Sequence, residues 1–479
     1  MINTLMHQIY LFFTKHINGI YQIMFLFLRK QIVDNITIQW HITTKCTNNC
    51  MHCYMTEQET FTKEQERTLD LSQKIDIVRN LDRFGRKYGF SFNRFVLIGG
   101  DPLLAEDVFD FTKLLKRLGK RVSFAGNPET LTNDNCKKLK KYGVPFFNLS
   151  LDGLEKTHDK IRGEGSFQRT IEGFEQLNRF KIKSAAMITV THLNATEFFD
   201  IINFLFYETK ANGVCFDFCT HIGNASEIPS SITPEMALDI SSRYLDMKKE
   251  KKKENPNFYF EEKPGFLRLL HLYRKDTVLW KSEKTKFFAG CHIGCKCQCI
   301  LSDGTLLACR RLPIIIGRLP EDDFEKIFLM NETLKKYRRP QYFQDCGNCI
   351  GWNICRGCPA ISSAESGNPF LKPSICFSHL LDMNTHLEHS SISMKTTHKE
   401  EASLIQNHVT QGYYMYLLTR WFPTKLSRAV SILRKDGEID NFMLNHQKWF
   451  LEKAPNLNID EQATLIYHVN VSRIHDRNI

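Results

Sequence analysis

Three cysteines near residue 50 carry the clearest chemistry in this chain. Cys46, Cys50 and Cys53 lie in the run KCTNNCMHCY with the spacing C-x3-C-x2-C. Thiolates at this spacing hold three irons of a [4Fe–4S] cube, whereas clusters that only carry electrons normally take four cysteines. The open fourth iron predicts a reactive centre that a small molecule can chelate. Zinc is the alternative, but zinc modules favour paired C-x2-C hooks, and none follows within forty residues.

The elements that must position these cysteines alternate between strand and helix. Residues 36–43 are predicted as a strand that ends just before Cys46. Five further strands and five helices follow, predicted from apolar runs and helical periodicity: strands 95–98, 121–125, 145–151, 185–191 and 214–219, and helices 71–84, 108–118, 133–142, 167–180 and 197–209. The alternation predicts an α/β fold, a partial (β/α)6 barrel of the TIM type with right-handed crossovers. In such barrels the chemistry lies at the carboxyl ends of the strands.

Two further motifs fall at predicted strand ends. Gly99-Gly100-Asp101-Pro102 follows the second strand, and Ser150-Leu151-Asp152-Gly153 closes the fourth, with His158-Asp159 and Arg162-Gly163 after it. Together with the three cysteines, these motifs resemble the radical S-adenosylmethionine (radical SAM) enzymes. The resemblance covers about residues 36–225. It implies a [4Fe–4S] cluster on Cys46, Cys50 and Cys53 whose open iron binds S-adenosylmethionine.

The resemblance also assigns ligand contacts to the first glycine motif. The backbone of Gly99, Gly100 and Asp101 would contact the methionine amino group, because glycine lets backbone approach a ligand closely. The family usually has Glu where this chain has Asp101. An ordinary Gly-Gly turn is the alternative.

The second motif would hold the rest of S-adenosylmethionine. Ser150 and Asp152 would lie near the ribose, and Arg162 would hold the methionine carboxylate with its planar fork. A turn Asp and a surface Arg are the alternative. The backbone of His52 would lie near the adenine. Val190 is a further candidate for adenine contact, or plain core.

A second group of cysteines lies between Cys291 and Cys376, where ten of the sixteen occur. The order Cys291-x12-Gly304-x4-Cys309, Cys346-x2-Cys349-x5-Cys355-x2-Cys358 and Cys376 resembles the SPASM domain, which carries two auxiliary [4Fe–4S] clusters. The family often has three residues where this chain has only Arg356-Gly357. The resemblance implies an outer cluster on Cys346, Cys349, Cys355 and Cys376, and an inner cluster on Cys291, Cys309 and Cys358 plus a fourth ligand.

The fourth ligand of the inner cluster stays open among Cys295, Cys297 and Cys299. At i, i+2 and i+4 of a strand, all three thiols would share one face. Cys295 is the preferred ligand, and the others would be small buried hydrophobes. A zinc ribbon over residues 346–358 is the alternative, although a ribbon needs four ligands and this region has a surplus.

Cys215 and Cys219 lie four residues apart on the sixth predicted strand and face the same side. Cys219 is at the active-site end, where a thiol can donate a hydrogen atom to a substrate radical, as an epimerase requires. Core packing is the alternative for this residue.

Length and composition predict a globular protein of two or three domains, with 479 residues, 42% hydrophobic and 24% charged. The expected organisation is an N-terminal helical segment (1–35), the radical SAM core (36–240), a linker helix (241–285), the SPASM cluster domain (286–385) and a helical C-terminal extension (386–479). Residues 388–401 are expected to be a flexible connection.

The charge distribution and the apolar segments indicate which partners and which cellular compartment to expect. The net charge of +11 is spread thinly, with one dense run at 248–253, so nucleic acid is not expected as a partner. Residues 9–28 lack signal-peptide features, and their apolar part is too short for a transmembrane segment. Thiolates awaiting iron need a reducing compartment, which indicates the cytoplasm.

SPASM-type radical SAM enzymes mostly act on peptides or proteins. The resemblance therefore implies a maturase that uses a 5′-deoxyadenosyl radical to abstract hydrogen from a ribosomally made precursor peptide and install a crosslink, an epimerised centre or an oxidation. Its electron donor would be a flavodoxin or ferredoxin. The nearest alternative is an anaerobic sulfatase maturase that forms formylglycine. Alternatives of another class are an inactive peptide-binding scaffold and a zinc-binding module.

Overall fold

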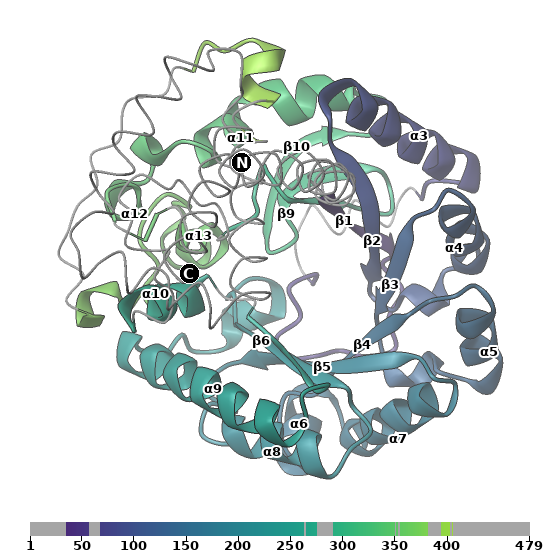
Figure 1. Cartoon of the computed structure of the whole chain (residues 1–479), viewed down its shortest axis with the longest axis vertical. Coiled ribbons are helices and arrows are strands. Elements are labelled where there is room, and N and C mark those ends of the chain that lie inside the picture. The colour runs from purple at the N-terminus through teal and green to yellow at the C-terminus, as the bar shows by residue number, and fades with distance from the viewer. Residues whose placement is uncertain are drawn as a thin grey trace, which may run out of the picture.

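The computed structural model describes residues 35–56, 68–262, 265–274, 291–349, 351–352, 355–381, 394–402 and 405. Residues 1–34 of the expected N-terminal helical segment and most of the expected C-terminal extension (386–479) lie outside the described residues. Within the described part, one curled sheet forms the centre and helices surround it (Figure 1).

The sheet has ten strands in the order β10-β9-β8-β1-β2-β3-β4-β5-β6-β7. Each pair from β8 through β1 to β7 is parallel. In the described sheet, the β8–β9 and β9–β10 pairs are antiparallel. The strand bounds are β1 Asn35–Thr43, β2 Ser91–Gly99, β3 Arg121–Ala125, β4 Phe146–Ser150, β5 Lys183–Val190, β6 Gly213–Phe218, β7 Tyr259–Glu261, β8 Cys297–Ile300, β9 Thr305–Cys309 and β10 Leu312–Arg318.

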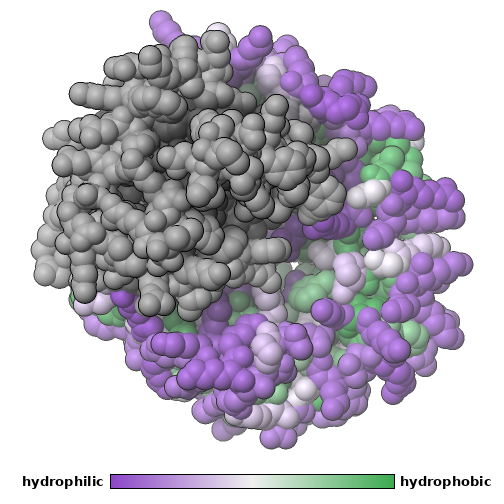
Figure 2. All heavy atoms as spheres, viewed as in Figure 1, coloured by the Kyte–Doolittle hydropathy of each residue, from purple (hydrophilic) through white to green (hydrophobic). Residues whose placement is uncertain are grey.

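Helices connect consecutive parallel strands and cover the outside of the sheet (Figure 1). Their bounds are α3 Leu71–Tyr88, α4 Val108–Arg117, α5 Asn133–Lys141, α6 Glu155–Arg162, α7 Ser166–Arg179, α8 Phe198–Tyr207, α9 Pro234–Glu254, α10 Phe266–Tyr273, α11 Glu332–Tyr337, α12 Gln344–Gly347 and α13 Pro359–Ser366. The predicted partial (β/α)6 barrel is confirmed, and α6 is an additional helix that the apolar pattern did not indicate. Hydrophilic residues line the outer rim that these helices form (Figure 2).

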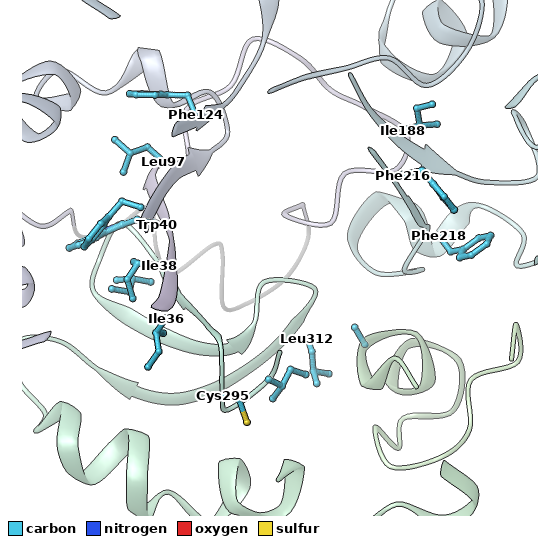
Figure 3. Packing of buried hydrophobic residues seen from close by; sticks show 14 of the residues in the cluster. Ile36, Ile38, Trp40, Leu97, Phe124, Ile188, Phe216, Phe218, Cys295 and Leu312 are labelled. Atoms are coloured by element: carbon cyan, nitrogen blue, oxygen red, sulfur yellow. The ribbon is translucent and has the colours of Figure 1, made fainter. Parts of the chain in front are cut away.

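Strand residues alternate between a helix-facing side and an inner side of the barrel. Ile38, Trp40 and Phe216 are fully buried in the hydrophobic core. Figure 3 shows these side chains, on opposite walls of the barrel, turned toward the surrounding helices. The side chains that alternate with them face inward, because successive residues of a strand point to opposite faces.

The inward-facing side of the barrel, which we call the lumen, is polar and accessible. Its residues are mostly half-buried, in contrast to the fully buried residues between them. They include Thr37, Gln39, Ser123, Asn148, Ser150, Met187, Thr189 and Asp217. A barrel whose inner residues are polar and retain exposure offers a binding site rather than a second apolar core.

The cysteine-rich region shares the sheet of the barrel. β8 pairs in parallel with β1, with Thr37 opposite Cys297 and Trp40 opposite Ile300. The hairpin of β9 and β10 continues from it. The expected boundary at residue 240 falls inside α9, which continues to Glu254. The two expected domains are therefore joined by strand pairing as well as by the chain.

A buried ion pair fixes part of the segment that was expected to be a flexible connection. Glu401 is fully buried, and its two carboxylate oxygens lie 2.9 Å from Arg338 Nη1 and 2.7 Å from Arg339 Nη2. Both arginines are at the end of α11 and are also buried. Because a charge is buried only when it is paired, this carboxylate holds the segment from residue 394 onto the cysteine-rich region.

Among the helices that the structure describes, none has both the length and the apolar character that a transmembrane span requires.

Candidate functional site

The loop of Cys46, Cys50 and Cys53 follows the carboxyl end of β1 and is held from the opposite wall of the barrel. Asn224, which follows β6, donates from its backbone N to the Cys53 carbonyl at 3.0 Å and from Nδ2 to the Cys50 carbonyl at 3.1 Å. Gly223 beside it is left-handed, with φ of 60°, and a Cβ there would lie 2.5 Å from the Cys53 carbonyl oxygen. The segment after β6 therefore fixes the shape of this loop.

Two donors reach the thiols themselves. Asn127 Nδ2 lies 3.2 Å from Cys46 Sγ, and Arg162 Nη1 lies 3.5 Å from Cys50 Sγ. Burial raises the pKa of Cys50, Arg162 opposes this, and the thiols of Cys53 and Cys46 raise it further. The three thiols are therefore close enough to repel one another when ionised, and one neutral amide and one guanidinium donate to them. This is a fitting environment for a metal cluster, because a bound cation keeps such thiols deprotonated.

Among the described residues, no three His, Cys, Asp or Glu side chains are arranged to share a single metal ion. Ligands of a [4Fe–4S] cube stand farther apart, since each binds a different iron.

Gly99 and Gly100 permit β2 to end directly beside the cysteine loop. Gly99 has φ of 140°, and a Cβ there would lie 2.2 Å from the Thr43 carbonyl oxygen. A Cβ on Gly100 would lie 2.2 Å from the Lys45 carbonyl oxygen. Both distances are impossible for real atoms, so these glycines are needed for the approach of the two backbones. The structure thus gives them a role toward the cysteine loop, alongside the ligand role that the sequence suggested.

The Asp101 side chain points into the protein. It accepts from Leu103 N at 3.1 Å and from Thr130 Oγ1 at 2.7 Å, and its own N donates to the Lys45 carbonyl at 2.7 Å. Burial raises its pKa to about 6, against the two hydrogen bonds. Asp101 therefore anchors the turn after β2, and the shorter Asp in place of Glu fits this buried position.

Asp152 is the most densely bonded side chain of the site and is fully buried. Its Oδ2 lies 2.9 Å from His52 Nε2 and 2.5 Å from Arg162 Nε, and its Oδ1 accepts from Thr189 N at 2.6 Å. Burial alone would raise its pKa, but the charges of Arg162 and His52 hold the pKa well below its usual value. The carboxylate is therefore ionised and joins the cysteine loop, α6 and β5.

The remaining residues predicted around S-adenosylmethionine divide between the site and the core. Ser150 ends β4 and faces the lumen, half-buried. The His52 side chain contacts Asp152, as described above. Val190 is fully buried in the hydrophobic core, where its backbone carbonyl accepts from Cys219 N at 2.9 Å. The structure therefore does not bring the Val190 side chain to the site.

The four cysteines expected around the outer cluster lie together. Burial and the thiols of Cys376 and Cys349 raise the pKa of Cys346 above its usual value. Cys355 responds in the same way to burial, Cys376 and Cys346. Gly351 N donates to Cys349 Sγ at 3.3 Å. The charge of Cys376 acts on each of the other three thiols, so the four lie close together in a site that fits a metal cluster.

Cys297 lies nearer to the other thiols of the inner group than Cys295 does. Burial and the thiol of Cys309 raise the pKa of Cys297 to about 12, and Cys291 contributes as well. Burial, Cys358 and Cys309 likewise raise the pKa of Cys291 to about 12, against Arg356. No thiol of the described residues acts in this way on Cys295, whose pKa responds to burial and to Arg356.

The expectation that Cys295, Cys297 and Cys299 share one strand face is wrong, because β8 begins only at Cys297. Cys295 lies in the preceding turn and is fully buried in the core. Figure 3 shows it directed away from the hairpin toward neighbouring helices. Cys299 packs with Leu301 and Leu307 in a small separate cluster.

The short connection of Arg356-Gly357 is closed by two consecutive left-handed residues, with φ of 64° and 65°. A non-glycine residue in this region is uncommon and needs support from its surroundings. Arg356 receives that support because its buried side chain donates from Nη1 to the Cys291 carbonyl at 2.8 Å. The missing residue is thus accommodated by backbone geometry, and Arg356 links the two cysteine groups.

Cys219 lies just after β6, between the Asp152 network and the inner cysteine group. It is 6% exposed, and burial raises its pKa to about 12 against the charge of Arg311. Arg311 Nη2 lies 2.8 Å from Asp217 Oδ2, and burial raises the pKa of Cys358 against the charge of Arg311. The thiol of Cys219 is therefore protonated at neutral pH.

Asn127 and Asn224 were not singled out from the sequence. Both follow predicted strands, β3 and β6, at the carboxyl ends where polar residues of a parallel barrel gather. That position was the available signal, although it does not reveal which sulfur or carbonyl each amide contacts.

Replacing Gly100 with Ala tests the close approach of β2 to the cysteine loop. We expect Gly100→Ala to displace the loop and to lose the iron of this centre, because the new Cβ overlaps the Lys45 carbonyl oxygen. Iron and sulfide content per chain, compared with Cys46→Ala, measures the loss. Gly119→Ala is the control, since a Cβ there meets no atom within 4 Å and costs only about 1–2 kcal/mol of left-handed strain. Wild-type iron content in Gly100→Ala would contradict this account.

Known proteins share both the sequence motifs and the fold. The Radical SAM superfamily matches residues 40–205. The AdoMet-dependent heme synthase of Methanosarcina barkeri is 27% identical over 346 residues, covering 71% of this chain and 95% of that protein. The sporulation killing factor maturation protein SkfB of Bacillus subtilis is 22% identical over 294 residues, covering 61% of this chain and 64% of SkfB.

Solved structures show the same fold at low sequence identity. SuiB of Streptococcus suis, with its precursor peptide SuiA bound, superposes with a TM-score of 0.56 at 16% identity, covering 72% of this chain and 77% of SuiB. SuiB has also been solved with S-adenosylmethionine. Since the family match spans the segment that contains the three cysteines, Asp152 and Arg162, the chain is an enzyme with a radical SAM domain at residues 40–205.

Proposed function

We propose that this radical SAM enzyme modifies a ribosomally made peptide that it binds in the barrel lumen between two groups of cysteines. The observation that carries the proposal is the arrangement of these groups. Cys46, Cys50 and Cys53 follow the carboxyl end of β1, whereas Cys297 pairs with Thr37 near its amino end. Six residues of strand separate Thr37 from Thr43, which corresponds to about 20 Å. The accessible, polar lumen lies between them.

At the carboxyl end, Cys46, Cys50 and Cys53 would hold the [4Fe–4S] cluster that binds S-adenosylmethionine. When bound and reduced, this cluster supplies the electron that splits S-adenosylmethionine into methionine and a 5′-deoxyadenosyl radical, which takes a hydrogen atom from the substrate. Asn127 and Arg162 hold the thiols through hydrogen bonds to Cys46 and Cys50. Asp152 keeps Arg162 oriented and charged.

At the amino end, the two further cysteine groups would hold auxiliary [4Fe–4S] clusters. The outer one would take Cys346, Cys349, Cys355 and Cys376. The inner one would take Cys291, Cys297, Cys309 and Cys358. The mutual effects on thiol pKa support both sets, and they favour Cys297 over Cys295 as the fourth inner ligand.

Two likenesses support a peptide as the substrate. SkfB is named as a maturation protein, and the SuiB structure of the same fold contains a precursor peptide. The lumen is lined by polar side chains such as Gln39, Asn148 and Ser150, which can donate and accept hydrogen bonds. Such a lining suits an extended peptide, because the backbone amides of the peptide need hydrogen-bond partners.

The second candidate substrate is a tetrapyrrole. The similarity to the Methanosarcina heme synthase extends over 95% of that protein, so it includes the cysteine-rich part as well as the barrel. In this reading the same lumen holds a tetrapyrrole ring with its carboxylate side chains.

Cys219 is a candidate hydrogen donor if the modification is an epimerisation. It lies at the end of β6 close to Asp152, and burial keeps its thiol protonated. An S–H group in this position can give a hydrogen atom to a carbon radical in the lumen, which leaves a thiyl radical that takes one electron from the electron donor and one proton to become the thiol again.

The radical chemistry itself is tested by the fate of S-adenosylmethionine. We expect reconstituted protein with dithionite to form 5′-deoxyadenosine, and Cys50→Ala to reduce this to the background of iron-free protein, because one of three ligands is lost. Chromatography of the reaction measures the product. Failure of the intact, iron-loaded protein to form 5′-deoxyadenosine would rule out the proposal.

The substrate is tested by mass and by absorbance. With a peptide encoded beside the gene and co-expressed, we expect a mass loss of about two units for a crosslink or oxidation, or an unchanged mass with a changed stereocentre for epimerisation. With iron coproporphyrin III instead, a reaction changes the porphyrin absorbance and releases carbon from its side chains. Conversion of the porphyrin without any change to the peptide would favour the second candidate.

Substituting the disputed cysteines tests the inner cluster. We expect Cys297→Ala to lower iron and sulfide by about one cluster per chain, because it removes the fourth thiolate. Cys295→Ala is the matched control, because it removes a thiol only two residues away, and we expect it to retain the iron. The proposal of Cys297 as ligand fails if the two variants give the reverse result.

The role of Cys219 is tested in deuterated water. We expect Cys219→Ala to lower deuterium incorporation into the product by at least roughly tenfold, since no exchangeable S–H remains at that position. Cys215→Ala, on the same strand and side, is the control. Full turnover and incorporation in Cys219→Ala would leave this thiol a packing role only.

A further inference from the structure

Two arginines face the lumen close to the inner cysteine group. Arg94 lies on β2, where it pairs with Thr37 of β1, and Thr37 in turn pairs with Cys297 of β8. Paired residues of neighbouring strands point to the same face, so Arg94 and Cys297 share the lumen side. Arg310 directly follows Cys309 at the end of β9. β9 pairs with β8 in antiparallel fashion, with Leu307 opposite Cys299, so Cys309 lies beside Cys297 and Arg310 follows it.

Arg310 also reaches the loop at the other end of the lumen. Its guanidinium carbon lies 5.9 Å from the centre of the Tyr54 ring, and Tyr54 is the residue after Cys53. The Tyr54 hydroxyl lies 3.3 Å from His41 Nε2 on β1. Stacking on an aromatic ring holds a guanidinium in place and leaves its N–H groups directed outward. Arg310 is thus fixed between the cysteine loop and the inner cysteine group.

Neither arginine is neutralised. In the part of the chain that the structure describes, no carboxylate forms an ion pair with Arg94 or Arg310. The neighbouring Arg311 behaves differently, because it pairs with Asp217 at 2.8 Å and donates to the Phe218 carbonyl at 3.2 Å. Asp152 is likewise paired with Arg162. Asp217 and Asp152 are therefore already paired with other arginines, and neither forms an ion pair with Arg94 or Arg310.

An unbonded polar group lies between the two arginines. Gln39 of β1 faces the lumen, half-buried, with Val96 of β2 on one side and Cys299 of β8 on the other. Its amide makes no hydrogen bond to another described residue. Convergent polar groups that lack protein partners are typical of a ligand site, since the ligand supplies the missing partners.

We propose that Arg310 and Arg94, with Gln39 between them, form a subsite that binds a carboxylate of the substrate. The proposal deepens the proposed function, on which it rests, by giving the substrate an acidic group. A guanidinium matches a carboxylate with two parallel N–H···O bonds, which fixes orientation as well as affinity. The acid bound here lies beside the inner cysteine group, so the rest of the substrate extends through the lumen toward Cys46, Cys50 and Cys53.

Binding of defined acids to the iron-loaded protein, without S-adenosylmethionine or reductant, tests the subsite. One probe is iron coproporphyrin III, compared with its tetramethyl ester by absorbance. The other is fluorescent hexaglutamate, compared with hexaglutamine by anisotropy. We expect one acid to bind at least about tenfold more tightly than its uncharged counterpart. The acid that does so identifies the source of the carboxylate as a tetrapyrrole or a peptide side chain.

Variants connect this preference to the two arginines. Arg310→Gln and Arg94→Gln should each reduce the preference by about tenfold, and Arg310→Lys should keep part of it because it keeps the charge without the planar fork. Arg117→Gln removes the same charge from the exposed end of α4 and should change nothing. If Arg310→Gln does not fold, Arg94→Gln carries the test, since its side chain is exposed.

The subsite is overturned if neither acid binds better than its uncharged counterpart, or if Arg310→Gln and Arg94→Gln match Arg117→Gln. Its failure is separate from that of the proposed function. If the wild-type protein forms 5′-deoxyadenosine but shows no preference for acids, only the proposal of the subsite is wrong. If the wild-type protein prefers acids but forms no 5′-deoxyadenosine, only the proposed radical reaction is wrong.

Discussion

The rest of the site depends on the hydrogen bonds and the ion pair of one buried carboxylate, that of Asp152. An ionised group without exposure is stable only if it is paired and fully hydrogen-bonded, because desolvation is otherwise too costly. Asp152 meets this condition through His52, Arg162 and the backbone of Thr189. Each partner comes from a different segment, so satisfying one charge positions the cysteine loop, α6 and β5 together. The guanidinium beside Cys50 Sγ follows from the same bond.

The close approach of β1 and β2 is the second constraint. Parallel strands end at the same edge of a sheet, and here the loop after β1 runs directly beside the end of β2. Only residues without a Cβ fit there, since any side chain at Gly99 or Gly100 would overlap a backbone carbonyl. Asp101 then turns the chain inward and anchors it through Thr130. The cysteine loop is thus supported by two strands and by Asn224 across the barrel.

Strand pairing also decides how far apart the cysteine groups lie. Because β8 joins the free edge of β1, the cysteine-rich region continues the barrel sheet instead of packing as a separate unit. This pairing places Cys297 at one end of the lumen and the loop of Cys46, Cys50 and Cys53 beyond the other. It also gives the lumen its charge balance, since Arg311 meets Asp217 across it while Arg94 and Arg310 meet no carboxylate of the described residues.

The sequence by itself determined the strand–helix alternation, the barrel class and the cysteine triad, because these depend on periodicity and spacing between near neighbours. All six predicted strands occur, at bounds that differ by a few residues. Only the tertiary structure decided which of these thiols lies on β8, since the strand starts at Cys297 and leaves Cys295 in the preceding turn. It likewise decided that Asn127 reaches Cys46 and that Val190 faces the core. These contacts join residues far apart in the chain, and no local pattern encodes which strands and loops will meet.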